Sequence, residues 1–226
     1  MGDFARAVLE GVKELRRSDP QLRIFGAISH RYHFNPRATE REVASCQRLW
    51  GMKLPADYRE FLLDVGNGGA GPFYGVFRLG EWDGAGDGEP WEASIIGDPS
   101  KPFPHRSPWN EPRKYALAPS DVESDEYHRW MDLEDRRYYA PELTNGSIPI
   151  CTEGCALRFL LVVTGPEAGH VWYDSRADEK GLLPLGEGQE RLSFSDWYLA
   201  WLENSLYESV HGPRTEKPSR GRAPRG

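Results

Sequence analysis

Apolar side chains recur at helical spacing in the first part of the chain. The four positions at this spacing are Phe4, Val8, Val12 and Leu15. Residues three or four apart share one side of a helix, and the run Ser18-Asp19-Pro20 that follows disfavours its continuation. The pattern predicts an amphipathic helix over residues 3–17 and an irregular segment over residues 21–37.

Two further helices are predicted before residue 70. Thr39 and Glu42 have the spacing of a capping box, in which the hydroxyl accepts a backbone N–H and the carboxylate reaches back. Gly51 is expected to end that helix. Pro55 begins the next one in its first turn, where the missing N–H costs nothing. Its apolar face consists of Tyr58, Phe61, Leu62 and Val65. One residue of the pair Gly66-Asn67 is expected to close it with a left-handed turn.

Runs of β-branched and aliphatic residues predict the strands. They are Phe73–Leu79, Ile148–Ile150, Leu157–Val163 and His170–Tyr173. The turn-forming run Gly165–Gly169 separates the last two, which are expected to form an antiparallel hairpin. A closing helix begins at Ser193, with Asp196 at the capping-box position. We also expect Trp172 to share one core with the pair Phe61-Leu62. The order of the elements indicates an α+β fold rather than alternating βαβ units.

The chain is predicted to divide into a helix, one domain and a tail. Residues 1–20 hold the first helix, and residues 21–207 hold the α+β domain. Within this domain, residues 80–146 form an irregular acidic insertion, with a short helix expected between residues 121 and 139. Residues 208–226 form a basic tail without large apolar residues, and we expect the tail to be disordered.

Charge and composition narrow the class of partner. The 226 residues carry 28 Lys and Arg against 35 Asp and Glu, a formal net charge of −7. Residues 212–226 contribute +4, which leaves −11 for the rest. Nucleic-acid-binding proteins normally present a basic face, so we expect no nucleic acid as a partner.

The sequence also bears on location. No apolar run approaches the roughly 20 residues of a membrane span, and three cysteines are too few for a disulfide framework. We therefore expect no membrane partner and a cytoplasmic location.

Three patterns that look like chemical motifs are better explained as structure. Gly66–Gly71 matches GxGxxG, but a dinucleotide site needs a strand before the glycines and a helix after them, and here the order is reversed. Cys151 and Cys155 lack the further ligands that zinc requires, so they are interpreted as small buried thiols. His30 and His33 are interpreted as surface or half-buried side chains. We expect no cofactor, no required metal and no catalytic residue.

Several blocks of the sequence share their letters and their order with one known family. They are Leu54–Leu63, Gly66–Pro72, Ile148–Cys151, Gly154-Cys155, Leu161–Pro166, Gly169–Asp174 and Ser193–Leu202. Over residues 22–206 these blocks resemble the SMI1/KNR4 family of the SUKH superfamily. The resemblance implies a single α+β domain with a twisted antiparallel sheet flanked by helices. The long acidic insertion and the basic tail depart from the family's pattern.

The resemblance also implies a function. Many bacterial members are immunity proteins that bind and neutralise a cognate polymorphic toxin, often a nuclease or a deaminase, and others are regulators or scaffolds. We therefore expect a non-enzymatic protein-binding domain. An immunity role is the first hypothesis, a regulatory or scaffold role of the same fold is the alternative, and a hydrolase that uses carboxylates has the least support.

The predicted partner-binding residues lie at the start of the acidic insertion. They are Glu81, Trp82, Asp83, Asp87, Glu89, Trp91 and Glu92. Acidic side chains without a neighbouring base are expected to attract a basic toxin domain, and tryptophan is enriched at interface hot spots. The alternative is that the two tryptophans only pin the loop to the body.

Overall fold

A four-stranded antiparallel sheet lies at the centre of the fold, with the strand order β3-β4-β5-β6. The structure is a computed structural model that describes residues 1–82, 89–92, 96–187 and 190–213. The strands are β3 (Ser147–Gly154), β4 (Leu157–Val162), β5 (Val171–Asp174) and β6 (Leu182–Pro184). The predicted hairpin is confirmed, since β4 pairs with β5 and Leu160 lies opposite Trp172.

Side chains of the sheet alternate between two apolar clusters. Leu161 and Val171 belong to the larger cluster, whereas Leu160 and Trp172 belong to a smaller one. The smaller cluster also contains Phe103, Val162 and Leu182. Successive strand residues point to opposite faces of the sheet. Because both faces are covered, the strands have continuous apolar sequences instead of alternating ones. The prediction that Trp172 shares one core with Phe61-Leu62 was wrong, because that pair lies in the larger cluster.

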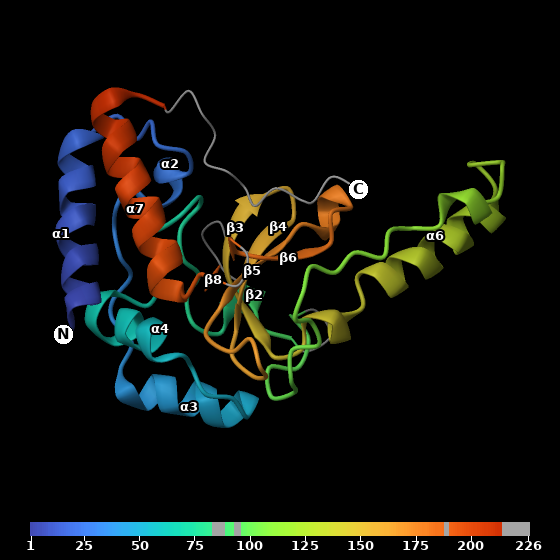
Figure 1. The fold of residues 1–226 in the computed structure, drawn as a ribbon, viewed down its shortest axis with the longest axis horizontal. Coiled ribbons are helices and arrows are strands. Elements are labelled where there is room, and N and C mark those ends of the chain that lie inside the picture. Colours follow the sequence, from blue (N-terminus) through green and yellow to red (C-terminus); the bar gives the residue numbers. More distant parts are fainter. Residues whose placement is uncertain (83–88, 93–95, 188–189, 214–226) are drawn as a thin grey trace.

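Helices pack on the larger cluster. α1 (Asp3–Ser18) and α7 (Phe194–His211) lie side by side at one end of the molecule (Figure 1) and supply buried side chains to this cluster. Gly11 permits their close approach, because a Cβ there would lie 2.6 Å from Cδ2 of Leu202. α3 (Glu40–Trp50) and α4 (Ala56–Glu60) lie below them, and α4 continues as the π-helical turn η1 (Phe61–Val65).

The predicted helix caps are present. The Thr39 hydroxyl accepts the N–H of Glu42, whose carboxylate accepts the N–H of Thr39. Gly51 ends α3 in the left-handed conformation. Ser193 and Asp196 form the same box at the start of α7. These signals are local in the sequence, so they carry over directly to the structure.

Two local predictions were wrong. Gly66 is extended, with φ 179°, and the left-handed residues are Gly68 and Gly69. The run Phe73–Leu79 is not a strand, because Phe73 has φ 52° and Gly75 has φ 99°. Extended backbone cannot pass through these two residues, and only isolated bridges remain in this run.

The remaining elements connect this framework. They are α2 (Ala27–His30), β1 (Glu81–Trp82), β2 (Glu89–Pro90), η2 (Tyr115–Leu117), α6 (Asp125–Tyr138), η3 (Pro141–Thr144), η4 (Arg176–Asp178), β7 (Gly186–Glu187) and β8 (Glu190–Arg191). The helix expected between residues 121 and 139 is α6. α7 extends to His211, so residues 208–211 are helical rather than part of a tail, and residues 214–226 lie outside the described residues. The chain is one α+β domain, as predicted. Within the described ranges, no helix has the length and apolar character that crossing a membrane requires.

Candidate partner-binding surfaces

Trp91, a predicted partner contact, is part of the core. Its side chain is only 6% exposed and packs edge-on against Trp50, with 5.8 Å between the ring centroids. Its indole N–H donates a hydrogen bond of 2.8 Å to the carbonyl oxygen of Glu81. This residue therefore pins the loop to the body, the alternative considered for it, and the expectation that it anchors a partner is corrected.

The other predicted partner-binding residues that the structure describes are less buried than Trp91. Trp82 is half-buried, and the guanidinium of Arg158 lies over its ring at 4.7 Å from the centroid. Glu81 is half-buried and Glu92 is exposed. Glu89 is paired with Trp82 where β2 meets β1. The two remaining residues, Asp83 and Asp87, lie outside the described residues. The role of the acidic side chains in this loop stays a prediction.

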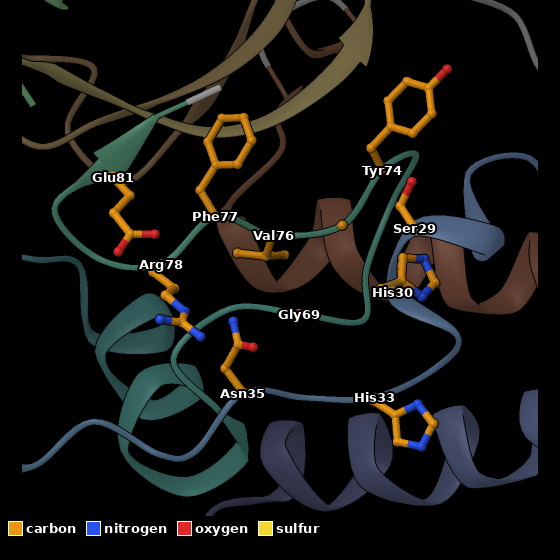
Figure 2. Close-up of a pocket in the computed structure, with 11 residues that line it drawn as sticks. Ser29, His30, His33, Asn35, Gly69, Tyr74, Val76, Phe77, Arg78 and Glu81 are labelled. Carbon is orange, nitrogen blue, oxygen red and sulfur yellow. The ribbon is translucent and has the colours of Figure 1, made fainter. Parts of the chain in front are cut away.

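A polar pocket of about 270 Å³ opens beside this loop. Figure 2 shows its lining side chains, which come from α2 and the segment after it on one side and from residues 69–81 on the other. They are Ser29, His30, His33, Asn35, Gly69, Tyr74, Gly75, Val76, Phe77, Arg78 and Glu81. The pocket therefore joins the predicted histidine pair to the first residue of the predicted binding loop.

His30 has a structural role in the pocket wall. The N–H of Tyr32 donates to its Nδ1 at 3.0 Å, so this nitrogen carries no proton. Burial lowers the pKa of His30 from 6.5 to about 4, and the imidazole is neutral near pH 7. The interpretation as a surface or half-buried pair is thus wrong for His30, which is buried, and right for His33, which is exposed. No group of three His, Cys, Asp or Glu that could hold a metal ion occurs in the described ranges.

Strained backbone gathers around the pocket. Arg31 and Tyr32 have φ of 48° and 58°, and Phe73 has φ 52°. Left-handed backbone is unfavourable for bulky residues, so the surroundings must hold it. Tyr32 donates its hydroxyl to Asp19 at 2.6 Å, and Phe73 stacks on Phe159 at 4.9 Å. Strain of this kind clusters at functional sites, which marks the pocket as a candidate surface.

An exposed apolar patch borders the pocket, and we call it the aromatic rim. It consists of Phe25 and Tyr74. They are 58% and 40% exposed, and their ring centroids are 5.5 Å apart. Grouped apolar side chains at the surface mark interaction sites more often than scattered ones do.

A second candidate surface is a projecting arm, which we define as residues 112–139. It runs outward through η2, turns, and returns along α6, so that the start of α6 lies far from the sheet (Figure 1). Leu117 and Leu133 are 72% and 65% exposed on it, and Val122 is also exposed. Sequence reasoning recognised the helix but missed the arm as a surface, although single apolar residues among acids were visible there.

A polar network holds the base of the arm to the body. The guanidinium of Arg113 is almost buried and lies 2.6 Å from both Asp135 and Glu179. It also lies over the rings of Tyr138 and Tyr139, at 5.4 Å from each centroid. Burial alone would lower the pKa of Arg113, but hydrogen bonds with these acids and with Tyr139 raise it above its ordinary value. The guanidinium thus stays charged and fixes the direction of the arm.

The cysteines do not form a paired site. Cys151 is buried, and burial raises the pKa of its thiol well above its ordinary value. Cys155 is exposed, so its interpretation as a buried thiol was wrong. A buried thiol with a raised pKa is unreactive, which agrees with a packing role for Cys151.

A model of the SMI1 / KNR4 family (SUKH-1) matches residues 37–198, a span that includes the sheet, the pocket residues from 69 to 81 and the whole arm. No curated protein and no solved structure matches the chain. The family model covers well over half of the 226 residues, and it confirms the resemblance seen in the sequence. The chain therefore belongs to the SMI1/KNR4 family.

Proposed function

We propose that this protein is an immunity protein, which binds one cognate bacterial toxin of the nuclease or deaminase type and blocks it. One observation carries the proposal. Residues 81–146 contain 15 acidic and 7 basic residues, a net charge of −8, and the part of this insertion that forms the arm projects from the body with exposed apolar side chains.

The charge suits a partner that acts on nucleic acid. Such proteins bind phosphates through Lys and Arg, so their working surfaces are basic. A surface of the opposite sign accelerates association and favours this class of partner over others. Apolar side chains within that surface then slow dissociation, because their burial is non-directional and excludes water.

Binding rather than catalysis is proposed because the buried histidine of the pocket has a structural role. The buried histidine of the pocket is neutral and accepts a backbone hydrogen bond. The three cysteines are free thiols, and we propose the cytoplasm as the compartment because thiols stay reduced there. A regulatory or scaffold role of the same fold would use the same surfaces on a different partner.

Co-expression tests the proposal. The immunity role requires a toxin domain encoded beside this chain's gene, and the lack of such a neighbour would count against it. That domain would be induced in a sensitive host with and without the protein. We expect survival only with the protein, and a one-to-one complex in gel filtration of the two purified chains. Continued killing at equal expression, together with separate elution of the two chains, would contradict an immunity role.

A further inference from the structure

We propose that the distal end of the arm, residues 117–128, inserts into the basic cleft where the toxin binds its nucleic acid, so that the protein and the nucleic acid compete for one site. This inference rests on the proposed function. It names the contacting element and the way in which the toxin is blocked.

The distal end is uncovered. Leu117 and Val122 are exposed there. Tyr115 is also exposed, but it donates its hydroxyl to Glu179 of the body at 2.6 Å and therefore belongs to the base of the arm. A monomer gains nothing from these exposed apolar groups, whereas an interface buries them. The apolar surface on the arm is therefore available for a partner.

The charge at the distal end has one sign. Its acidic residues are Asp121, Glu123, Asp125 and Glu126, and residues 117–128 contain no Lys or Arg. The nearest cations in the sequence, Lys114 and Arg129, are exposed on either side of this segment, and His128 is exposed at its end. The cations that face inward, Arg113 and Arg137, are already ion-paired within the chain. A basic partner thus complements the distal end.

The shape of the arm suits a cleft rather than a flat face. α6 has 14 residues, which corresponds to a length of about 21 Å and a diameter of about 10 Å with its side chains. Its N-terminus, capped by Ser124 through a hydrogen bond from Tyr127 N–H, lies at the distal end (Figure 1). The outgoing half of the arm packs on this helix nearer the body, through Lys114 N–H to Glu134 and the ring of Tyr115 to that of Trp130. The turn before Ser124 and the first turn of α6 therefore form the narrow tip that the proposal places in the groove.

The base of the arm reduces the cost of binding. Arg137 bonds to Glu134 at 2.7 Å and to Glu111 at 3.3 Å, and Tyr138 donates its hydroxyl to Asn110 at 2.8 Å. With the Arg113 network, these contacts hold both halves of the arm before any partner arrives. Pre-organised contact surfaces lose less conformational entropy on association.

Two arm variants test the proposal against the toxin domain encoded beside the gene. Asp121→Asn with Glu123→Gln removes two charges ahead of the helix, and Leu117→Ser with Val122→Ser removes exposed apolar area. Asp125 and Glu126 stay unchanged because acids in the first turn stabilise a helix. Glu10→Gln with Glu14→Gln, two exposed acids on α1, removes the same charge elsewhere and serves as the matched control.

Stopped-flow association and dissociation rates give the readout. We expect the charge variant to associate about five- to tenfold more slowly at low salt, with a weaker salt dependence. The apolar variant should dissociate at least about tenfold faster. The α1 control should match the parent in both rates, and all four proteins should share one thermal midpoint. A non-cleavable oligonucleotide should slow association of the parent in proportion to its occupancy of the toxin.

The outcomes separate two kinds of failure. If the parent does not bind the toxin, the proposed function is wrong. If the parent binds and both arm variants match it, the arm is not the contact, and the inference is wrong while the function stands. A ternary complex of protein, toxin and oligonucleotide would contradict insertion into the cleft. A fifth protein that combines Asp83→Asn, Asp87→Asn, Glu89→Gln and Glu92→Gln tests the loop, and a loss of binding confined to it would contradict the inference and assign the contact to the loop.

Discussion

Arg113 and Glu179 form an ion pair, with 2.6 Å between Nη1 and Oε1. Glu179 follows η4, next to the sheet, and Arg113 begins the outgoing half of the arm. The same guanidinium contacts Asp135 in the returning helix. One side chain therefore links both halves of the arm to the body.

Replacing Arg113 should loosen the arm. Arg113→Met keeps the side-chain volume but removes the cation from Asp135 and Glu179, and Glu179 keeps only the hydrogen bond from Tyr115. Breaking a buried pair costs about 3–5 kcal/mol, and the half-exposed acids reduce the expected loss of unfolding free energy to about 1–3 kcal/mol. Urea denaturation measures the loss, and hydrogen exchange in α6 should accelerate. Lys114→Met, at an exposed neighbour, should leave both unchanged, and an equal effect of the two substitutions would contradict the role of Arg113.

Stability should fall between pH 6.5 and pH 4 because of His30. Its pKa is about 4 in the folded chain, below its ordinary 6.5, so in this window the unfolded chain binds the proton and the folded chain does not. The contribution is fully present above pH 6.5 and is lost as the pH falls, by up to about 3 kcal/mol. Denaturation at pH 7 and pH 5 should show a smaller difference for His30→Gln than for the parent or for His128→Gln. If the loss of stability between pH 7 and pH 5 is the same in His30→Gln as in the parent, another group is responsible for it.

Trp172→Ala should lower the unfolding free energy by about 3–5 kcal/mol, because the ring is fully buried. Since Trp172 and Phe61 lie in different clusters on opposite faces of the sheet, the losses from Trp172→Ala and Phe61→Leu should add within about 0.5 kcal/mol. Chemical denaturation of both single variants and the double variant measures this. Strong coupling would show that the two clusters act as one core.

Gly26→Ala should be more harmful than Gly169→Ala. Both glycines have positive φ, 80° and 98°, so alanine is strained at either position by about 1–2 kcal/mol. A Cβ at Gly26 would lie 1.8 Å from the carbonyl oxygen of Phe73, whereas nothing lies within 4 Å at Gly169. The difference between the denaturation midpoints of Gly26→Ala and Gly169→Ala measures the cost of the steric clash beside the pocket. Equal midpoints would mean that the backbone at Gly26 moves to relieve the clash at no cost.

Features encoded by neighbouring residues were predictable from the sequence. The capping box of Thr39 and Glu42 needs only four positions, and the β4–β5 hairpin needs two runs and a turn. Phe73–Leu79 has the letters of a strand, but its left-handed residues are set by packing, through the stack of Phe73 on Phe159. The pattern of neighbouring residues in the sequence does not predict this contact, because Phe159 is far from Phe73 in the chain.

The candidate surfaces were harder to predict, because exposure depends on tertiary contacts. From the sequence, Trp91 is predicted to be an interface residue because it lies among acids. In the structure it packs against Trp50, which is 41 positions away in the sequence. Acids interrupted by single apolar residues also occur at residues 121–126, and the sequence does not distinguish that segment from residues 81–98. The two segments differ in the structure because residues 121–126 lie on the projecting arm. The base of that arm is held by the contact between Arg113 and Glu179, which are 66 positions apart in the sequence.

Calorimetric titration of the purified full chain with the toxin domain encoded beside its gene, repeated at about 50, 150 and 500 mM salt, tests the central claim most directly. We expect saturable one-to-one binding whose affinity falls steeply as salt rises, because the proposed contact joins an acidic arm to a basic surface. Absence of binding at all three salt concentrations, or binding that does not change with salt, would contradict the account.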